Sequence, residues 1–512
     1  MFLPFYIFTV FSHVLNQTFK QKIDHFAASD DRKFSQRYFV NFEYYGLTST
    51  CPIILYLGGE SELSPSKITE GTIVKIAKKS NALIVGLEHR FFGMSQPFNK
   101  LGKDELTYLT VDQALEDVAQ FIVYLRNRFC LNNKCNVLTV GGSYAGSLSS
   151  WTRLYYPHLA NFSWASSAPI RLIKEFPEYD SFVANILHLY HENCYKNVKL
   201  LFHDIQEAFD EGDTEKIQRY LNMFKIPLET DLTSSLYVIS NIISYAVQYD
   251  NKFNSVEALC KTQMGKNYDL DAFVNFYFNL LKLINLTPKD IDPLTYIDEE
   301  LNSSNAQMRA WTWMQCNELG WFSKSAGFQS PWINITFSEK ICNKLFNITI
   351  GNVDVISKRY GGIRPRNSFV LFTQGSNDPW SQVEISSVDK TIAQHFFLIK
   401  GGSHCSDMYE SKNDSSYVKA VKEEIVQILS DWLNDKCMKL CKMGKCLNDR
   451  CLCDKDWSGE YCTFKVISYK RFWAIGITSL MMLMVIIISI GGISWCIIHQ
   501  KQKEQYLQTL HY

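Results

Sequence analysis

The sequence predicts an α/β protein in which a mainly parallel sheet is covered by helices and interrupted by a large helical insertion. Three observations lead to this prediction. Short apolar runs alternate with an amphipathic helix in the first third, helical periodicity dominates from 171 to 350, and apolar runs of strand length return after that segment. Buried strands that alternate with helices are typical of a parallel sheet covered on both faces. The 512 residues, 46% of them hydrophobic, are enough for a large core.

The first part of the sheet domain is predicted to span 16–170. Its expected elements are strands at 52–57, 82–87 and 136–140 and a helix at 110–128. The strands are rich in Ile, Leu and Val, as buried strands are. The helix begins with a capping box, Thr110 to Gln113, and repeats apolar residues on one face. The alternation of strands with a helix therefore predicts a parallel sheet that is covered on both sides.

The second part of the sheet domain is predicted to span 351–434, after the helical insertion at 171–350. Strands are expected at 368–373 and 395–400, and a last amphipathic helix at 417–434. Few β-branched runs occur in the insertion, which favours helices there. The sheet is therefore predicted to form from two separated pieces of chain.

A sharp turn between strand and helix is predicted at Gly141 to Gly146, with Ser143 at its tip. Small residues on both sides of a serine allow a nucleophile elbow, in which the hydroxyl projects above the sheet edge beside backbone N–H groups. Ala145 stands where the G-x-S-x-G pattern has its second glycine. Ser143 is thus the candidate nucleophile for covalent hydrolysis.

A serine nucleophile needs a base, and the base needs an acidic partner that orients it. In α/β-hydrolases the acid and then the histidine follow the serine, each in a loop after a strand. Asp378 follows the predicted strand 368–373, and His404 follows the predicted strand 395–400. Ser143, Asp378 and His404 are therefore predicted to form a catalytic triad.

Several further segments, together with this order, resemble the serine peptidase family that contains lysosomal prolyl carboxypeptidase, dipeptidyl peptidase II and the thymus-specific serine protease. The matching segments are Gln21 to Phe26, Gln36 to Tyr38, Leu57 to Glu60, Glu88 to Gly93, Leu109 to Leu115, the elbow, Ala165 to Pro169, Trp313 to Cys316, Asn377 to Trp380, and His404. The elbow itself is most similar to that of the thymus-specific type. Ser147 is a departure, because some proline-specific members carry Met at this position.

The resemblance implies an α/β-hydrolase sheet with a helical cap inserted between nucleophile and acid, and hydrolysis of short peptides next to proline. It leaves open whether a C-terminal residue or an N-terminal dipeptide is released. The N–H of Tyr144, with one from the Gly58–Gly59 turn, would stabilise the oxyanion. Trp380 and Trp321 would line the pocket for the residue before the cleaved bond. Glu88, His89 and Arg90 would be structural.

The resemblance also implies two disulfides in the cap, Cys194 to Cys260 and Cys316 to Cys342. It assigns no partner to Cys51, Cys130, Cys135 or Cys405, and for Cys405 a free thiol, a disulfide and a packing role all stay open.

Six of the 15 cysteines lie between Cys437 and Cys462, a segment too short for a hydrophobic core. Their spacing resembles a compact EGF-like module, which implies the pairs Cys437 to Cys446, Cys441 to Cys451 and Cys453 to Cys462. A zinc site is the competing interpretation, but paired C-x2-C knuckles are missing. The module is expected to act as a stalk or to bind a protein partner.

The two ends of the chain indicate export and membrane anchoring. Residues 1–15 form an apolar run of signal-peptide length, and the uncharged run 472–498 is long enough to cross about 30 Å of hydrocarbon. With a cleaved signal, the protein is a type I single-pass membrane protein of the cell surface or the endolysosomal membrane, with a cytoplasmic tail at 499–512. Glycosylation sequons begin at Asn16, Asn161, Asn285, Asn302, Asn334, Asn347 and Asn413.

Other classes of function are less well supported. The formal net charge is zero and the basic residues are scattered, so a nucleic-acid partner is not expected. The triad chemistry uses no cofactor or metal, and none is predicted. An esterase or lipase on the same fold, or an adhesion or receptor protein that binds without turnover, are the alternatives. Whether the protein forms a homodimer stays open.

Overall fold

The computed structural model describes residues 14–46, 52–130, 135–385, 387–389, 393–434, 444–447, 450–455, 457–459, 462, 464–465 and 500–501. The chain divides into two compact units, Met1–Asn434 and Asp435–Tyr512.

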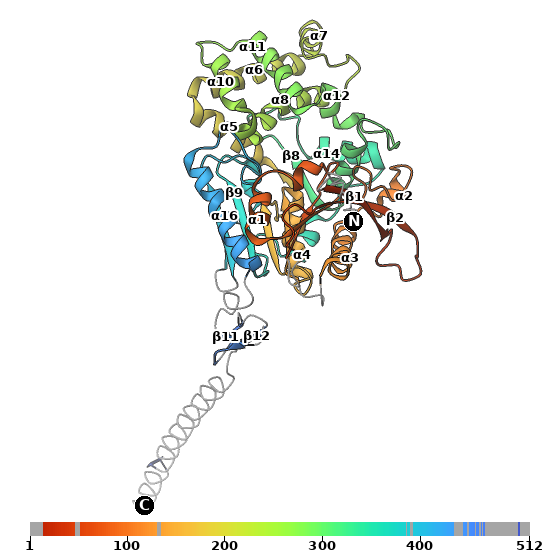
Figure 1. Ribbon diagram of the computed structural model, residues 1–512. Coiled ribbons are helices and arrows are strands. Elements are labelled where there is room, and N and C mark those ends of the chain that lie inside the picture. Colours follow the sequence, from red (N-terminus) through yellow and green to blue (C-terminus); the bar gives the residue numbers. More distant parts are fainter. Residues whose placement is uncertain are drawn as a thin grey trace, which may run out of the picture. The chain divides into compact units, whose positions relative to one another are not determined.

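An eight-stranded sheet forms the centre of the first unit (Figure 1). Its strands, in spatial order, are β1 (Val14–Lys22), β2 (Lys33–Asn41), β4 (Leu83–Leu87), β3 (Ile53–Leu57), β5 (Val137–Gly142), β6 (Phe162–Ser166), β9 (Val370–Gly375) and β10 (Gln394–Ile399). The pairs β1·β2 and β2·β4 are antiparallel, and the other five are parallel. This order and these directions are those of the α/β-hydrolase fold, as the sequence predicts.

The predicted strands match β3, β4, β5, β9 and β10 within one or two residues. The eight-stranded sheet contains three further strands that the sequence analysis does not predict: β1, β2 and β6. β1 is a mostly exposed edge strand, so its sequence has no apolar alternation that could predict it. It begins at Val14, two residues inside the predicted signal segment, and the rest of that segment lies outside the described residues.

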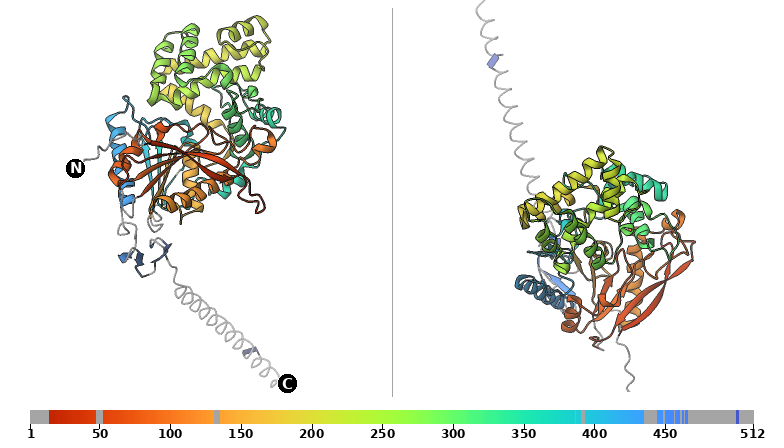
Figure 2. Two further views of the ribbon diagram at one scale, coloured as in Figure 1. Left: turned by 45° about the vertical axis from the view of Figure 1, so that its right-hand side comes forward. Right: turned by 90° about the horizontal axis from the view of Figure 1, so that it is seen from above.

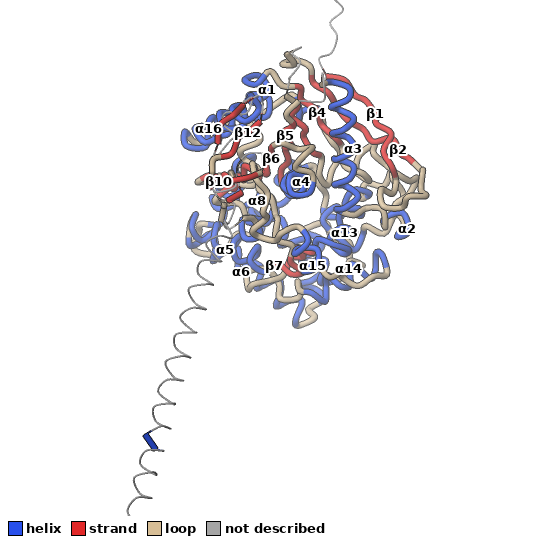
Figure 3. Tube along the Cα trace, turned by 90° about the horizontal axis from the view of Figure 1, so that it is seen from below, coloured by secondary structure: helices blue, strands red, loops and turns tan. Residues whose placement is uncertain are grey.

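Helices cover both faces of the sheet (Figure 3). α1 (Thr72–Ser80) packs on α16 (Ser416–Asn434) at one face, and α3 (Val111–Phe129) packs on α4 (Tyr144–Tyr155) at the other. α3 starts where the capping box predicts, because the Thr110 side chain accepts a hydrogen bond from the Gln113 N–H. Short helical turns η1 (Pro65–Ile68) and α2 (Lys103–Leu106) lie in the connections.

A helical segment lies between β6 and β9, and its first part, up to α12, lies above the sheet in Figure 1 and in the left view of Figure 2. It contains α5 (Pro177–Tyr190), α6 (Glu192–Asp210), α7 (Thr214–Met223), α8 (Leu232–Gln248), α9 (Asp250–Phe253), α10 (Ser255–Gln263), α11 (Leu270–Ile284), α12 (Pro288–Ile291), η3 (Pro293–Thr295), α13 (Ala306–Met314), the π-helical turn η4 (Gln315–Leu319), α14 (Ile335–Phe346) and α15 (Val353–Arg359). A small parallel pair, β7 (Ile173–Phe176) and β8 (Gly320–Ser323), encloses the part of this segment from α5 to η4.

The helical segment has two parts with different cores. Buried residues from α5 to α11, together with Ile291 of α12 and Phe328, form an apolar cluster of their own. Trp313, Trp321 and Ile341 instead belong to the main cluster, which also contains the sheet residues Leu55 and Val85. The predicted cap at 171–350 is therefore an independent helical layer followed by helices that pack on the hydrolase core.

Disulfides occur in both units. The first unit contains Cys194–Cys260 and Cys316–Cys342, as the resemblance implies, and also Cys130–Cys135, which the sequence left unassigned. Cys405 is a free thiol. Cys51 lies outside the described residues.

The second unit contains two small antiparallel pairs. They are β11 (Gly444–Leu447) with β12 (Arg450–Cys453), and β13 (Trp457–Ser458) with β14 (Phe464–Lys465). Cys453 is bonded to Cys462 as predicted, and Cys451 is also in a disulfide. Cys437 and Cys441 lie outside the described residues, so the other two predicted pairs stay predictions.

In the described part of the chain, no helix combines the length and the apolar character that a membrane span needs. The predicted span 472–498 lies outside that part. Among the sequon asparagines, Asn161 and Asn334 are half-buried. Their side-chain oxygens accept hydrogen bonds from the backbone N–H groups of Val137 and Thr336. The exposed ones are Asn16, Asn285, Asn302, Asn347 and Asn413.

Candidate active site

Ser143 sits at the turn between β5 and α4 in a strained conformation, with φ 58° and ψ −134°. Positive φ is unusual for a residue other than glycine and is typical of positions that the surrounding structure forces. A β-carbon at Gly141 would lie 2.0 Å from the Ala145 carbonyl oxygen, and one at Gly146 would lie 2.8 Å from the Ser166 oxygen. The close approach of helix to strand thus falls on Gly146, which explains why Ala145 is tolerated in this elbow.

Asp378 and His404 form a buried hydrogen-bonded pair in the loops that follow β9 and β10. His404 Nδ1 lies 2.7 Å from Asp378 Oδ2, and the two side chains are 4% and 0% exposed. A second carboxylate oxygen, Asp378 Oδ1, accepts the N–H of Trp380 at 3.0 Å. Because Asp378 accepts from Nδ1, the other ring nitrogen, Nε2, is left to receive a proton.

The nucleophile loop and the histidine loop meet at the carbonyl oxygen of Ser166, at the end of β6. The Ser143 N–H donates to this oxygen at 2.9 Å, and the Cys405 Sγ lies 3.9 Å from it. A β-carbon at Gly142 would lie 2.9 Å from the same Sγ. The residues next to Ser143 and next to His404 are therefore in contact. Ser143 itself is only partly buried.

The charge of Asp378 dominates the protonation of His404. Burial lowers the pKa of His404, but the neighbouring carboxylate outweighs it, so the pKa is raised well above its ordinary value. His404 Nε2 is buried and has no hydrogen-bond partner within the described residues. Glu384 is buried close by, and burial together with the charge of Asp378 raises its pKa well above the usual range. The negative charge beside His404 is thus concentrated on Asp378.

Two backbone N–H groups near the elbow, one directly after Ser143 and one in the loop after β3, are candidates to bind an oxyanion. Across the described residues, neither the Tyr144 N–H nor the Gly59 N–H donates to a protein acceptor. Gly59 lies against the first turn of α4, where its β-carbon would be 3.5 Å from the Ala145 side chain. Gly58 differs from the sequence-based expectation, because its N–H already donates to Leu87 O at 2.8 Å. Of the two glycines, Gly59 is the donor that remains.

A group of five aromatic residues, called the aromatic cluster here, lies beside the acid–base pair. Its members are Phe176, Tyr179, Trp311, Trp321 and Trp380. Trp380 is central: its ring lies 5.6 Å from Phe176, 5.6 Å from Tyr179, 5.7 Å from Trp321 and 6.2 Å from His404. Trp311 continues the cluster to the Tyr144 ring, 5.7 Å away. The cluster therefore extends from the nucleophile loop to His404.

Ser147 does not contribute to the aromatic cluster. Its side chain is fully buried, and the hydroxyl donates to Pro169 O at 2.8 Å. At this position, where some proline-specific members of the family carry Met, the Ser147 side chain points into the protein interior.

Comparison with known proteins agrees with this geometry. The family model "Serine carboxypeptidase S28" matches residues 21–425. The chain belongs to this family. The mouse (Mus musculus) thymus-specific serine protease is 29% identical over 445 residues, which cover 81% of this chain and 87% of that protein. The lysosomal Pro-X carboxypeptidase of Bos taurus is 26% identical over 451 residues, covering 83% and 89%. The protein is thus a serine peptidase of the S28 family.

Among solved structures, the proline iminopeptidase of Mycobacterium smegmatis matches with a TM-score of 0.37 and 9% identity, over 81% of this chain and 99% of that one.

The charged motif of this S28 chain at Glu88 to Arg90 is buried and structural. Arg90 is bonded to Asp117 at 2.6 Å and to backbone carbonyls, and Glu88 is paired with Arg37. His89 Nδ1 lies 2.7 Å from Arg90 O, and its Nε2 lies 3.1 Å from the Tyr144 hydroxyl. Burial lowers the pKa of His89 to about 4, so it is neutral. His89 thus contacts the side chain of Tyr144, the residue whose backbone N–H would face the oxyanion.

Several residues near the site carried no signal that a single sequence could reveal. Asp407 accepts hydrogen bonds from Ser166 Oγ at 2.6 Å and from Thr373 Oγ1, and so ties the histidine loop to β6 and β9. Gln248, the last residue of α8, contacts both Trp380 and His404. Nothing in the spacing of these polar residues distinguishes them from ordinary surface positions. Only the fold brings them together.

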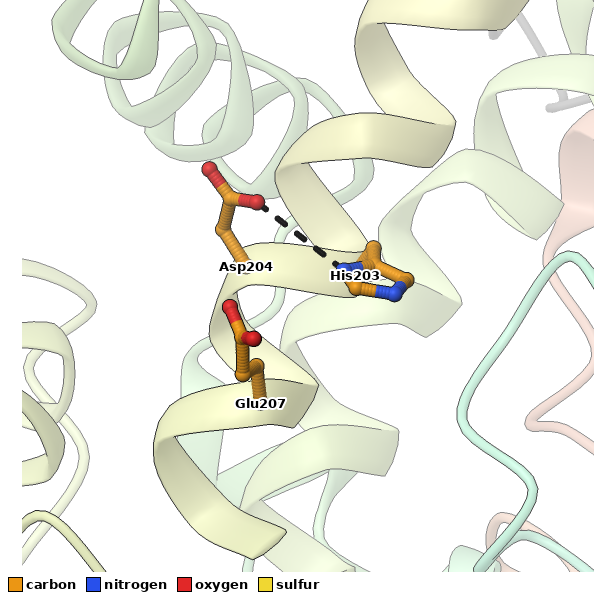
Figure 4. A group of neighbouring side chains, drawn as sticks. All are labelled: His203, Asp204 and Glu207. Carbon is orange, nitrogen blue, oxygen red and sulfur yellow. Dashed lines mark ion pairs between the residues drawn. The ribbon is translucent and has the colours of Figure 1, made fainter. Parts of the chain in front are cut away.

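His203, Asp204 and Glu207 place possible metal-ligand atoms within 4.8 Å of one another on α6 (Figure 4). His203 and Glu207 are exposed, and Asp204 already accepts a hydrogen bond from the Tyr268 hydroxyl. The group lies in the helical layer, and none of the contacts described above joins it to the triad. Exposed acidic groups on a helix are ordinarily solvated, so we assign no role to it.

Proposed function

We propose that this protein is a membrane-anchored exopeptidase that hydrolyses short peptides next to proline, with Ser143, His404 and Asp378 as its catalytic residues. The observation that carries the proposal is the buried His404–Asp378 pair beside the strained Ser143 and the aromatic cluster. Membership of the S28 family supports peptides as substrates. The Pro-X carboxypeptidase among its relatives supports proline as the preferred residue.

The proposed reaction proceeds through an acyl-enzyme. Ser143 Oγ attacks the carbonyl carbon while His404 Nε2 takes its proton, and Asp378 stabilises the imidazolium that forms. The N–H groups of Tyr144 and Gly59 donate to the oxyanion, where each donor contributes about 3 kcal/mol in studied enzymes. His404 then protonates the leaving amine, and a water molecule activated by His404 releases the acyl group.

The aromatic cluster supports a compact, apolar residue in front of the cleaved bond. Trp380 is partly exposed and stands between His404 and the buried Trp321. A pyrrolidine ring packs well on an indole face because its compact, apolar C–H groups contact the flat aromatic surface. The segment from α8 to α9 reaches the histidine loop, since the His404 N–H donates to Gln248 O at 3.0 Å. A helical layer at this position favours short peptides over folded proteins.

The experiment uses the full-length protein in detergent-solubilised membranes. Free-amine Xaa-Pro-reporter peptides and N-blocked Pro-Xaa peptides distinguish release of an N-terminal dipeptide from release of a C-terminal residue. Ser143→Ala is expected to lower kcat by about 10⁶-fold. Ser147→Ala is the matched control, because it removes a buried hydroxyl one helical turn away and should keep kcat within about tenfold.

Two outcomes would contradict the proposal. Equal turnover by Ser143→Ala and the wild type would remove Ser143 from the mechanism. Turnover of ester panels without any peptide cleavage would favour an esterase.

We further propose a type I single-pass orientation, with the catalytic unit outside the cytosol. The predicted span at 472–498 and the exposed sequon asparagines support it. Resistance of the protein to alkaline extraction, together with a mass shift after removal of N-glycans, is the expected result. Full release by alkaline wash would refute the anchor.

A further inference from the structure

Gln248 contacts three residues of the candidate site at once. Its side-chain Oε1 accepts the Trp380 Nε1–H at 3.0 Å and the Tyr179 hydroxyl at 2.8 Å. Its backbone oxygen accepts the His404 N–H at 3.0 Å. An indole N–H can only donate, so the atom that faces it must be the amide oxygen and not the nitrogen. The orientation of the Gln248 amide is therefore fixed by chemistry.

These bonds close a ring through four residues. Gln248 O is joined to His404 N, and His404 Nδ1 to Asp378 Oδ2. Asp378 Oδ1 is joined to Trp380 N, and Trp380 Nε1 returns to Gln248 Oε1. His404, Asp378 and Trp380 come from the sheet domain, whereas Gln248 comes from the helical layer. The layer thus contributes one of the four members that hold the acid–base pair.

The contact between helical layer and histidine loop is reinforced one turn further on. The Asn251 N–H donates to Ser403 Oγ at 3.1 Å, and the Ser403 N–H donates back to Asn251 Oδ1. The Trp380 indole meanwhile touches other members of the aromatic cluster. Within the described residues, the indole N–H of Trp380 donates one hydrogen bond, to Gln248 Oε1. Loss of that hydrogen bond frees the indole to turn within its aromatic surroundings.

We propose that Gln248 is a positioning residue that sets the Trp380 indole and the His404 loop together, so that selection at the aromatic cluster and proton transfer depend on one another. The inference rests on the proposed function, in which Trp380 receives the residue before the cleaved bond. An indole with a fixed orientation presents an apolar surface of fixed shape. Such a surface distinguishes proline from alanine, because a pocket discriminates by the methylenes it can or cannot contact.

The test compares Gln248→Met with Gln248→Glu in the full-length protein. Methionine has a similar length but no strong acceptor, whereas glutamate keeps a carbonyl-type oxygen for the indole. Kinetics are measured on matched peptides with Pro or Ala before the cleaved bond, on the pH plateau of each variant. Gln248→Met is expected to lower kcat/KM for the Pro peptide at least tenfold and to reduce the Pro/Ala ratio about tenfold. Gln248→Glu should restore the ratio to within about threefold of wild type.

Gln263→Met on α10 is the matched control. Gln263 is also buried in the helical layer, but its amide bonds only residues of its own neighbourhood, Thr262 and Asp269. The Gln263→Met variant loses a comparable number of side-chain hydrogen bonds, none of them to the candidate triad, so its Pro/Ala ratio should equal that of the wild type. Thermal unfolding of all variants shows whether each one folds. Equal changes of the Pro/Ala ratio in Gln248→Met and Gln263→Met would overturn the proposal, because they would show that Gln248 contributes only to the stability of the fold.

A second readout does not depend on peptide substrates. Diisopropyl fluorophosphate phosphorylates the serine of a working triad, fluoride leaves, and the proton goes to the histidine. The rate of this reaction at Ser143 reports on the position of His404. Gln248→Met is expected to slow it about tenfold, and Gln248→Glu is not. If the wild type reacts with the reagent but cleaves no peptide, the proposed function fails, and the reaction rate still tests the role of Gln248. Equal reaction rates in Gln248→Met and the wild type would overturn the proposal that Gln248 is a positioning residue.

Discussion

The two loops that carry the candidate triad are held in different ways. The loop of Ser143 is fixed by steric contact, because Gly141 and Gly146 leave no room for a side chain between α4 and the sheet. The loop of His404 is fixed by polar contacts with three other elements, through Asp407 to β6 and β9 and through Gln248 to α8. A small change in volume should therefore damage the first loop, and a small change in hydrogen bonding should damage the second.

The largest expected effect is on the polar side. Asp378→Asn removes the carboxylate that accepts from His404 Nδ1 and favours the wrong tautomer of the ring. The same change in a studied serine protease lowers kcat by about 10⁴-fold. Steady-state kinetics on the preferred peptide would measure it. A loss below tenfold would show that another group orients His404.

A steric change should displace the loop of Ser143. In Gly141→Ala the new β-carbon would lie 2.0 Å from the Ala145 oxygen, so α4 has to move. Overpacking of this kind costs about 1 to 3 kcal/mol of stability, and a displacement of about 1 Å at the nucleophile can cost 10²-fold in rate. Thermal unfolding and kcat would be measured together. Gly265→Ala is the control, because its β-carbon would be 3.4 Å from the nearest atom, the Asn267 oxygen, and both quantities should stay near wild type.

The pH dependence sharpens the comparison, because only the histidine loop titrates. The raised pKa of His404 means that the ring is protonated, and unable to act as a base, below a pH that lies above 6.5. The value of kcat/KM should thus fall about tenfold per pH unit on the acid side. In Asp378→Asn the stabilising charge is lost, so the acid limb should move to lower pH. An acid limb that stays in place would contradict the assigned cause.

Asp407→Asn is expected to have the smallest effect of the four. It keeps one acceptor oxygen but turns an amide group toward the hydroxyl of Ser166 or Thr373. Breaking one buried charge-assisted hydrogen bond costs about 1 to 3 kcal/mol of stability, and kcat should fall only a few-fold. Chemical denaturation and kinetics would test it, with exposed Asp31→Asn as the control. An unchanged midpoint would mean that the loop has other sufficient anchors.

The sequence was most informative where local chemistry determines the structure. The strands before Ser143, Asp378 and His404 are apolar runs, and each ends in a loop of small or polar residues, so their order could be predicted. The predicted helix 110–128 is shifted by one residue from α3, because its cap and its apolar face are both local signals.

The rest depends on contacts between distant parts of the chain. β1 is an exposed edge strand, and its partner β2 lies beyond a turn without an Asn-Gly or Asp-Gly signal. Gln248 and His404 are far apart in sequence, and nothing local pairs them. The N–H of Gly58 is bonded to Leu87 only because β3 and β4 are neighbours. Such facts require tertiary structure and cannot be read from one sequence.

The pairing of β7 with β8 has a consequence for how this enzyme can diversify. Ile173 stands opposite Gly320, so the segment 177–319 leaves the hydrolase domain and returns to it at nearly the same point. A segment with joined ends can change length cheaply, since each doubling of a flexible loop costs only about 0.6 kcal/mol in closure entropy. The length of this segment can therefore change while the pairing of β7 with β8 stays intact. Gln248 lies within the segment, so the proposed role couples any change of substrate preference at this position to the placement of His404.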